Sequence, residues 1–439
     1  MKKFLIAVLF LSHCSFDNKT GIWKNSNEID LIKKNRFENF ETLYAKQKSF
    51  NNIIPPKNDL QIILDPIKSN FEWPDEFYHN SNNYINFSYK NQNQVLFKSK
   101  RLASREIKDK FLFKDGNIFL TDIKGNIKVF SVEKQRVIYE FNFYKKKFKK
   151  LKKNLSFVIE KNIVYISDNI GYLYALNYKT QKLIWAKNFR IPFRSNIKIS
   201  GDLVILADQN NFLYFINKNN GERLKYIPTE EVIVKNDFIN SLALGNQSVF
   251  FLNNYGSLYS INKNNFAINW FVNLNTSLSV GTNNLFFSNQ IVFNKDKIII
   301  STDPNLYVIN SKTGSTIFKM PITSIVKPII SGKSLFIITK DNLLVCIDLD
   351  SGRLNYSIDI GNEIAKFLKS KQKPINIKFL SILNNNLFIF LNNSYLVNFN
   401  ANGKINGINK LPSKLETQPI FINDSILYLN KRKKLMIIN

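Results

Sequence analysis

Short apolar runs, separated by polar turns, fill most of this chain. In residues 171–185, GYLYALNYKTQKLIW, an alternating apolar run is followed by a polar turn and by a second run that ends in tryptophan. Period-two spacing over five to eight residues predicts β-strands, and polar interruptions of two to four residues predict hairpins. The pattern therefore predicts a chain built mostly from short antiparallel strands.

The same pattern returns eight times, at intervals of 37 to 52 residues, until the chain ends. Each copy has a short run before the central hairpin, then a second turn and a closing run after it. Four antiparallel strands in such a repeat are typical of a propeller blade, whereas one open sheet of about thirty strands would coil or split. The central hairpins begin at Gly116, Asn162, Asp202, Ser248, Lys297, Ser334, Asn386 and Ser425.

The turn inside the central hairpin carries glycine or asparagine in most copies. Both residues tolerate a positive φ, so their exchange at one position has a physical basis. The positions are Gly125, Gly171, Gly256, Asn211, Asn305 and Asn342.

The last copy stops at Asn439 after its third strand. Residues 84–101 supply spare strand material before the first copy, and we expect them to complete the last blade and close the ring, because an unclosed ring would expose two sheet edges. The predicted fold is all-β: an eight-bladed β-propeller of four-stranded antiparallel blades over residues 84–439, or seven blades if one weak copy is misread.

The first fourteen residues, MKKFLIAVLFLSHC, have the order of a secretory signal. Two lysines precede an apolar stretch that is far shorter than the roughly 20 residues of a transmembrane helix. Residues 11–14 resemble a bacterial lipobox, except that His13 stands where a small residue is usual. We expect residues 1–13 to be a lipoprotein signal peptide and Cys14 to be lipidated; the alternative is a free cysteine after an ordinary signal peptide.

Residues 14–83 show no repeat, and we expect them to form a tether with a short helix near residues 29–43 that packs in part on the propeller; the alternative for residues 15–30 is a wholly disordered tether. Ser15 after the cysteine, by resemblance to the bacterial sorting rule, implies the periplasmic face of the outer membrane of a Gram-negative bacterium. Prolines at 55, 56, 66 and 74 predict extended pieces after the helix.

Composition excludes several kinds of chemistry. The formal net charge is +29, but the lysines are spread along the whole chain and arginine is scarce, so a nucleic-acid partner is not predicted. Two cysteines and two histidines support neither a disulfide framework nor a zinc site nor a histidine general base. Residues 144–154, YKKKFKKLKKN, predict a solvated loop, or a contact with anionic lipid or an acidic partner.

Three segments, GYLYALNYKTQKLIW, GSLYSINKNNFAINW and NLYVINSKTGSTIF, resemble the quinoprotein-type (PQQ-like) propeller repeat. With the lipobox, the tether and the chain length, the sequence is most similar to the BamB lipoprotein family of outer-membrane barrel assembly. The resemblance implies that the aromatic residue closing each repeat packs on the neighbouring blade. These residues are Tyr139, Trp185, Trp270, Phe318 and Tyr356.

The resemblance to the BamB family also implies a partner and a binding surface. The partner would be the barrel-inserting outer-membrane subunit, bound through its periplasmic domains. The segment FRIPFRSN, residues 189–196, resembles a family connector with an apolar–arginine pair, which here corresponds to Phe193 and Arg194. The next long connector contains Glu230, Glu231 and Asp237, and of these Asp237 is the candidate partner-binding residue.

The competing interpretation is a quinone-dependent alcohol or sugar dehydrogenase. That family needs acidic and amide calcium ligands, a catalytic aspartate and usually an adjacent cysteine pair. The cysteine pair is missing, and Asp168, Asp208, Asp303 and Asp348 stand where a turn would be capped. We therefore expect a lipid-anchored scaffold with no enzymatic activity, cofactor or metal; the alternatives are an adaptor of another envelope complex or a degenerate quinoprotein.

Overall fold

The computed structural model describes residues 14–16, 23–25, 50–144, 148–231, 239–275 and 286–439. The chain divides into two units, Met1–Lys48 and Ser49–Asn439. In the first, β1 (Cys14–Phe16) pairs antiparallel with β2 (Trp23–Asn25). The predicted signal peptide and the predicted helix near residues 29–43 lie outside the described residues.

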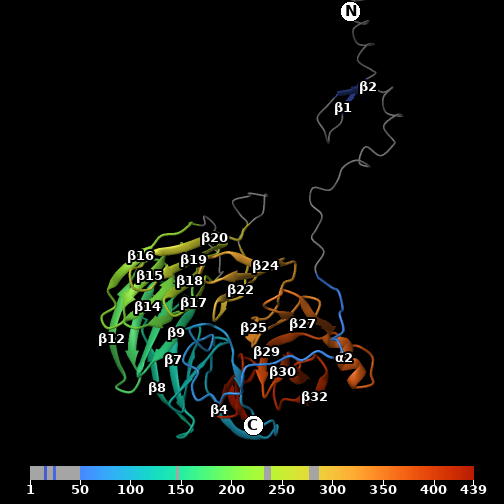
Figure 1. Cartoon of the computed structure of the whole chain (residues 1–439). Helices are drawn as coiled ribbons and strands as arrows, with labels where there is room; N and C mark the ends of the chain where they lie inside the picture. The colour runs from blue at the N-terminus through green and yellow to red at the C-terminus, as the bar shows by residue number, and fades with distance from the viewer. Residues whose placement is uncertain (1–13, 17–22, 26–49, 145–147, 232–238, 276–285) are drawn as a thin grey trace, which may run out of the picture. The chain divides into compact units, whose positions relative to one another are not determined.

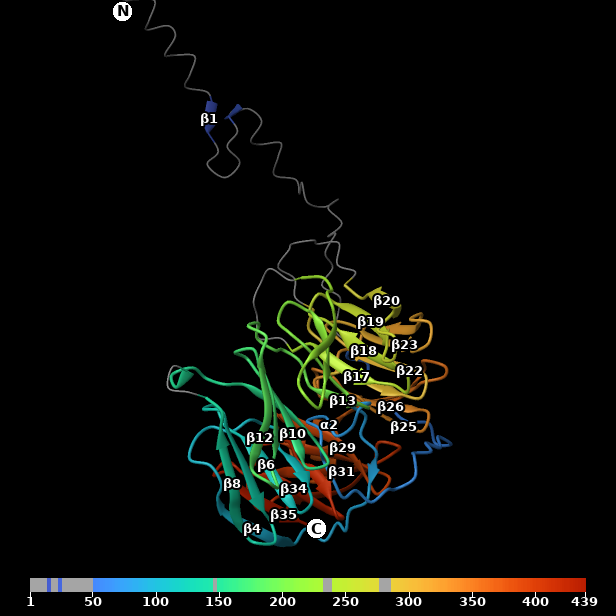
Figure 2. The same cartoon turned by 90° about the vertical axis from the view of Figure 1, so that its left-hand side faces the viewer.

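Eight β-sheets follow one another along the second unit, and each contains four antiparallel strands (Figures 1 and 2). The first strands of the first six sheets contact one another in succession, as expected for strands that surround a common axis. The sheets are the blades of an all-β propeller, as predicted, and the count of seven is wrong.

Blades 1 to 4 take sixteen strands in chain order. Blade 1 has β5 (Leu112–Lys114), β6 (Asn117–Thr121), β7 (Asn126–Ser131) and β8 (Arg136–Asn142). Blade 2 has β9 (Leu155–Glu160), β10 (Ile163–Asp168), β11 (Tyr172–Asn177) and β12 (Lys182–Asn188). Blade 3 has β13 (Lys198–Ser200), β14 (Leu203–Ala207), β15 (Leu213–Asn217) and β16 (Arg223–Ile227). Blade 4 has β17 (Ser241–Leu244), β18 (Ser248–Leu252), β19 (Ser257–Asn262) and β20 (Ile268–Asn273).

Blades 5 to 8 continue the order, and an N-terminal strand joins each of the last two. Blade 5 has β21 (Val292–Asn294), β22 (Lys297–Ser301), β23 (Leu306–Asn310) and β24 (Thr316–Met320). Blade 6 has β25 (Ile329–Ser331), β26 (Ser334–Ile338), β27 (Leu343–Asp348) and β28 (Leu354–Asp359). Blade 7 has β29 (Ile377–Leu383), β30 (Asn386–Leu391), β31 (Tyr395–Asn400) and β32 (Ile405–Lys410), with β3 (Asn86–Phe87) added in parallel. Blade 8 has β33 (Ile420–Ile422), β34 (Ser425–Leu429) and β35 (Lys434–Ile438), completed by β4 (Val95–Arg101).

The ring closes where the two ends of the propeller meet. Strand β4 pairs antiparallel with β35, with Arg101 opposite Lys434 and Phe97 opposite Ile437. The segment 84–101 therefore contributes to two blades, because β3 pairs with β29 of blade 7 while β4 supplies the fourth strand of blade 8.

Because consecutive strands of a blade run antiparallel, the two faces of the propeller are formed by different turns and connectors. We call the face that carries the turns between first and second strands, and between third and fourth strands, the turn face. The opposite face carries the turns between second and third strands and the connectors between blades, and we call it the connector face. Helix α2 (Ile360–Phe367) stands in the connector between β28 and β29 and was not predicted. Its N-cap is Asp359, whose side chain accepts a hydrogen bond from Asn362 N.

The closing aromatic residues join neighbouring blades, as predicted. Trp185 of blade 2 donates from Nε1 to Lys218 O of blade 3 at 2.9 Å, and its ring covers Gly221. A Cβ at Gly221 would lie 2.5 Å from that ring, so the contact requires glycine. The same arrangement recurs for Trp270 with Gly314, Phe318 with Gly352 and Tyr356 with Gly403, while Tyr139 donates to Gln181 O.

The hairpin turns follow the predicted glycine–asparagine rule at five of six positions. Gly125, Gly171, Gly256, Asn211 and Asn342 all have positive φ, whereas Asn305 is absent from the positive-φ residues and follows Pro304.

Residues 65–90, which we call the axial segment, run past the first strands of the blades. Trp73 exchanges backbone hydrogen bonds with Phe113 of blade 1, and Asn86 pairs with Ile382 of blade 7. Contacts with the other blades join Asp75 to Val158, Asp75 and Asn82 to Lys198, Asn82 to Leu242 and Ile291, Asn83 to Ile330, and Asn70 to Phe421. The axial segment therefore contacts all eight blades.

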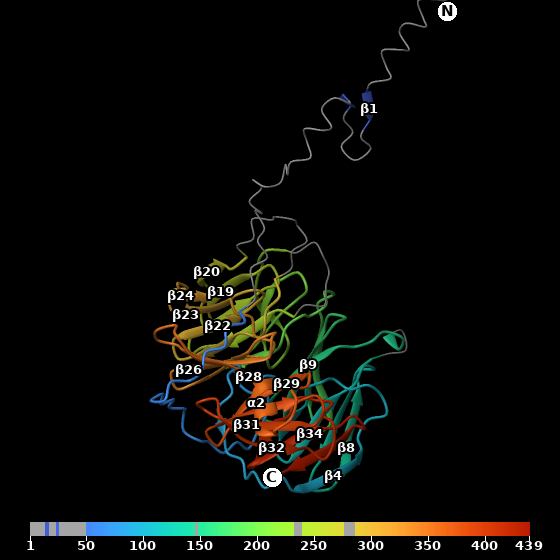
Figure 3. The ribbon, with the colours of Figure 1, turned by 90° about the vertical axis from the view of Figure 1, so that its right-hand side faces the viewer.

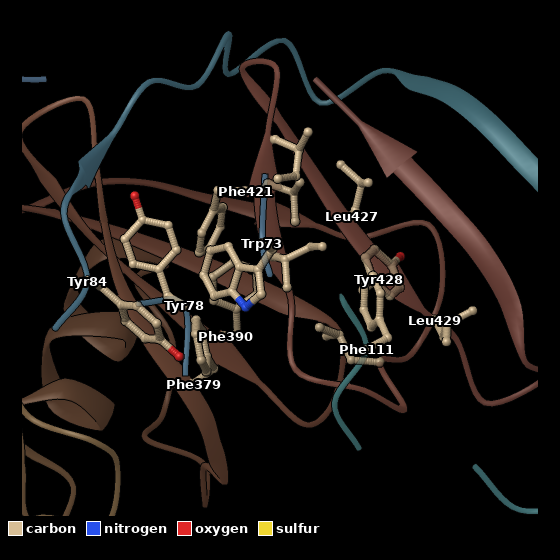
Figure 4. Packing of buried hydrophobic residues seen from close by; sticks show 14 of the residues in the cluster. Trp73, Tyr78, Tyr84, Phe111, Phe379, Phe390, Phe421, Leu427, Tyr428 and Leu429 are labelled. Atoms are coloured by element: carbon tan, nitrogen blue, oxygen red, sulfur yellow. The ribbon is translucent and has the colours of Figure 1, made fainter. Parts of the chain in front are cut away.

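The aromatic side chains of the axial segment explain this position. Trp73 is 2% exposed, and its ring lies 4.7 Å from that of Tyr78 and 5.6 Å from that of Phe87. Figure 4 shows Trp73 among aromatic residues of blades 7 and 8, including Phe390 and Phe421. Burial of several large aromatic side chains stabilises an otherwise irregular segment.

This packing corrects the boundary of the predicted tether: residues 50–83 belong to the propeller unit, whereas we expected a tether that packs on the propeller only in part. From Ser49 onward the chain belongs to the propeller unit, and backbone hydrogen bonds already join Ile54 to Ser357 of blade 6. Residues 50–83 could not be recognised as part of the fold because they carry no repeat and pair with strands distant in sequence.

Candidate partner-binding groove and central ion pair

Aspartates of the blade turns are held by hydrogen bonds. Asp168 Oδ1 accepts from the backbone N–H groups of Ile170, Gly171 and Tyr172, each at 2.8 Å. Asp208 does the same in blade 3, where Oδ1 accepts from Asn210 N and Phe212 N. These carboxylates cap turns, which is the structural role that the sequence favoured.

The other two turn aspartates also have structural contacts. Asp348 Oδ1 accepts from Ser351 N at 2.7 Å and from Ser351 Oγ at 2.6 Å. Asp303 pairs with Lys340 of the next blade. The four aspartates thus belong to separate blades and separate turns.

Burial raises the pKa of Asp168, while hydrogen bonds from Tyr144 and from three backbone N–H groups oppose that shift. Tyr144 Oη donates to Asp168 Oδ2 at 2.5 Å, which attaches the lysine-rich loop, residues 144–154, to blade 2. Of that loop, residues 145–147 lie outside the described residues, Lys149, Lys150 and Lys152 are exposed, and Lys153 is buried and donates to Phe148 O.

The connector at residues 189–196 leads from β12 of blade 2 to β13 of blade 3. Phe193 is 5% exposed, and its ring packs against Phe189 at 5.3 Å and Tyr214 at 6.0 Å. Arg194 is half-buried; its backbone N donates to Ala207 O, and its carbonyl accepts from Asn240 N. The Phe193 ring therefore supports the connector from the protein interior and is not presented at the surface.

The third predicted partner-binding residue, Asp237, lies outside the described residues. Of its neighbours in that connector, Glu231 is exposed and Glu230 is half-buried. Glu230 accepts hydrogen bonds from Asn253 Nδ2, Ser257 Oγ and Tyr259 Oη of blade 4. Burial alone would raise the pKa of Glu230, but hydrogen bonds outweigh burial and leave the pKa lowered, so Glu230 holds the connector to the blade.

A groove of about 560 Å³ lies beside the 189–196 connector, between the outer strand β12 of blade 2 and strands β15 and β16 of blade 3. We call it the Phe189 groove. Its lining residues are Lys187, Asn188, Phe189, Arg190, Ile191, Phe212, Tyr214, Gly221, Glu222, Arg223 and Tyr226.

Stacked aromatic rings and cationic side chains characterise the Phe189 groove. Tyr226 stacks on Phe212 at 6.0 Å and on Tyr214 at 6.2 Å, and the Arg223 guanidinium lies 4.8 Å from the Tyr226 ring. Tyr226 is 42% exposed. Three cationic residues and one carboxylate line the groove, so it presents aromatic surface with excess positive charge. Tyrosine and arginine are enriched at binding hot spots.

At the centre of the ring, a buried ion pair fixes the axial segment to blade 3. Lys198 Nζ lies 2.7 Å from Asp75 Oδ2 and donates also to Asn82 Oδ1 at 2.6 Å and to His79 O at 2.8 Å. The Lys198 side chain is 0% exposed. Burial lowers the pKa of Lys198, and the Asp75 carboxylate opposes this shift.

Sequence reasoning missed these groups and the Phe189 groove. Lys198 is one lysine among many, and Asp75 lies in a segment that was predicted to be a tether. The available signal was Trp73, because solvated linkers contain few aromatic residues.

The described residues contain no group of three or more histidine, cysteine, aspartate or glutamate side chains placed to hold a metal ion. Cys346 is buried in blade 6. No helix within the described ranges combines the length and the apolar character that crossing a membrane requires.

Comparisons with known proteins match this architecture. Residues 124–357, more than half of the chain, match the family model of outer membrane protein assembly factor BamB. An uncharacterized protein of Rickettsia conorii is 23% identical over 311 residues, covering 67% of this chain and 72% of its own length.

Among solved structures, BamB from Moraxella catarrhalis has a TM-score of 0.60 at 13% identity, and the match covers 79% of this chain and 99% of that one. Quinohemoprotein alcohol dehydrogenase from Comamonas testosteroni has a TM-score of 0.58 at 9% identity, covering 84% and 80% of the two chains. At these identities the structural likeness shows the propeller fold alone.

Proposed function

Because the chain belongs to the family of the outer membrane protein assembly factor BamB, we propose that it is a non-enzymatic scaffold of outer-membrane β-barrel protein assembly. In this proposal the propeller binds the barrel-inserting subunit through that subunit's periplasmic domains. It acts at the periplasmic face of the outer membrane, where a lipid on Cys14 holds it.

The observation that carries the proposal is the Phe189 groove. It adjoins the connector that the family resemblance singled out, and it exposes Tyr226 and Arg223 on a rigid sheet edge. The ring stack from Phe212 through Tyr226 fixes these side chains before a partner arrives, which lowers the entropy cost of binding. The excess positive charge favours a partner surface that carries aspartate or glutamate around an apolar centre.

Charge reversal in the connector tests this role. Arg190 is exposed, and its backbone N donates to Asn188 Oδ1, so Arg190→Glu reverses a groove charge without touching a blade interior. We expect mild detergent extraction of Arg190→Glu to recover much less barrel-inserting subunit than the wild type. Arg194→Glu tests the residue chosen from the family resemblance, with the melting temperature measured to exclude misfolding.

Lys312→Glu is the matched control, because Lys312 is exposed in a turn of blade 5, away from the Phe189 groove. Normal recovery for Arg190→Glu and Arg194→Glu alike would contradict binding at this surface. Recovery of a different envelope complex in place of the barrel-inserting subunit would instead favour the alternative adaptor function.

Anchoring is tested separately from partner binding. One acyl chain binds membranes only marginally, whereas several chains anchor stably. Tethering raises the local concentration of the groove near a membrane partner, so weak contacts suffice. Cys14→Ala is expected to release a folded protein into the soluble fraction that still binds its partner in vitro. Retention of Cys14→Ala in the membrane fraction would show that the anchor is not at Cys14.

A quinone-dependent dehydrogenase is the second candidate, because the fold is also that of quinohemoprotein alcohol dehydrogenase. The described residues do not fit a calcium–quinone site: Asp168, Asp208 and Asp348 accept hydrogen bonds in separate turns, and Asp303 pairs with Lys340. We expect no dye reduction with alcohols or sugars after addition of the quinone cofactor and calcium. Measurable turnover would overturn the non-enzymatic proposal.

A further inference from the structure

A cavity of about 390 Å³ lies at the connector face, beside the axial segment. Phe77 and Tyr84 of the axial segment are among its lining residues. Both side chains are buried, and they close the cavity on the side of the protein interior. The remaining lining comes from connectors and first strands of several blades, with Lys110 before β5, Lys327 before β25 and Lys378 in β29. A volume of this size is within the range of small-molecule sites.

The charged side chains of this cavity all have the same sign. Among its lining residues the ionisable groups other than Tyr84 are Lys110, Lys327 and Lys378, and we call the cavity the lysine pocket. Within the described part of the chain, no carboxylate lies within 4.0 Å of any of the three ammonium groups. Their positive charge is therefore not neutralised by a direct ion pair among these residues.

Neutral groups hold the three ammonium groups in place. Lys110 Nζ lies 3.6 Å from the centre of the Phe77 ring, and Lys327 Nζ lies 3.2 Å from the centre of the Tyr84 ring. Lys327 also donates to Asn82 O, and Lys378 donates to Leu415 O at 3.1 Å and Glu416 O at 2.9 Å. An ammonium group has three N–H donors, so each of the three lysines retains donors for a ligand.

We propose that the lysine pocket binds a small, multiply charged anion with carboxylate or phosphate oxygens. Three half-buried ammonium groups line this one cavity, where Lys110 and Lys327 repel each other, and an anion among the three adds attraction. Burial lowers the pKa of each of these lysines, and the Asp109 carboxylate opposes this shift at Lys110 and Lys378. Closure by the axial segment limits the ligand to a small molecule rather than a threaded chain.

Calorimetric titration of the full chain in detergent tests this inference, with phosphate and pyrophosphate in one arm and malate and citrate in the other. The ionic strength is matched with chloride, because a chain of net charge +29 attracts anions everywhere. We expect one equivalent to bind, and the stronger arm identifies the anion class. Lys110→Met is the first variant, since within the described residues the Lys110 ammonium group donates no side-chain hydrogen bond and lies against the Phe77 ring.

Lys110→Met and Lys378→Met are each expected to weaken binding roughly 10- to 100-fold, as for the loss of a charged hydrogen bond. Lys312→Met, which removes an exposed lysine outside the pocket, is expected to leave the affinity unchanged. The proposal is wrong if no anion binds above the chloride background, or if the two pocket variants and Lys312→Met weaken binding alike. Melting temperatures of all variants show whether a loss of binding reflects a loss of folding.

Discussion

Trp73 and Trp185 are both buried, but they pack against residues at very different distances along the chain. Trp185 closes a repeat and packs on the turn of the next blade, 33 residues along the chain. Trp73 belongs to the non-repeating axial segment and packs against residues as distant as Phe421. The ring of blades is thus specified by contacts between neighbours in sequence, whereas the axial segment is specified by contacts with the finished ring. Figure 3 shows the blue part of the chain, which includes the axial segment, beside the orange and red strands of the last blades.

This difference predicts that the axial segment stabilises the whole ring. Trp73→Ala removes a buried ring that contacts Tyr78, Tyr84 and Phe87, and we expect a loss of about 3–5 kcal/mol in the free energy of unfolding. Phe71→Ala is the control, because Phe71 lies two residues earlier and is 66% exposed. Chemical denaturation measures both variants. Equal stability of the two would mean that the axial segment does not stabilise the propeller.

The ion pair between the axial segment and blade 3 gives the next largest effect. Lys198→Met leaves the Asp75 carboxylate buried without its cation, and we expect a loss of about 3 kcal/mol. In the Asp75→Asn background, Lys198→Met should cost clearly less, because no carboxylate is then left unpaired. A double-mutant cycle by denaturation measures the coupling, and additive effects would contradict it.

The blades and the axial segment also differ in how far the sequence predicted them. The blades were predictable because each strand pairs with the next one along the chain, and the glycine of a turn such as Gly221 marks where the neighbouring ring fits. The axial segment was not, since Trp73 and Asp75 acquire their meaning only from strands that follow much later. The sequence located the 189–196 connector but not the Phe189 groove. The groove forms between two blades, and nothing within a single repeat indicates that Tyr226 lines it.

We expect anion binding in the lysine pocket to depend on pH. Burial places the pKa of Lys327 well below its usual value; the charges of Lys198 and Lys110 act in the same direction, and Asp75 opposes them. A bound anion would raise the pKa of Lys327, so binding takes up a proton. Citrate affinity should therefore fall as the pH rises above the lowered pKa, by up to about tenfold per pH unit for one proton.

Calorimetric titrations in buffers of different ionisation enthalpy measure this proton uptake. The Lys327→Gln variant should lose the part of the proton uptake that Lys327 contributes. Tyr84, whose ring Lys327 covers, has a pKa that burial raises above its usual value, so this hydroxyl stays protonated over the same range. An affinity that does not change with pH in the wild type would show that Lys327 does not face the anion.

The smallest effect expected concerns a single blade contact. Trp185→Phe keeps an aromatic ring over Gly221 but removes the hydrogen bond to Lys218 O, and we expect a loss of about 1 kcal/mol. Phe318 already covers Gly352 without such a bond, so phenylalanine is compatible with this position. A loss as large as that for Trp73→Ala would erase the distinction between blade contacts and axial contacts.

Site-specific photo-crosslinking in cells tests the proposed scaffold function most directly. A photoreactive residue replaces Tyr226 in the Phe189 groove or, as a matched control, Ile317 on the outer strand of blade 5, whose exposed fractions are 42% and 40%. We expect an adduct with the barrel-inserting outer-membrane subunit from position 226 and none from position 317. Adducts of equal yield from both positions, or an adduct from position 317 alone, would contradict partner binding at the Phe189 groove.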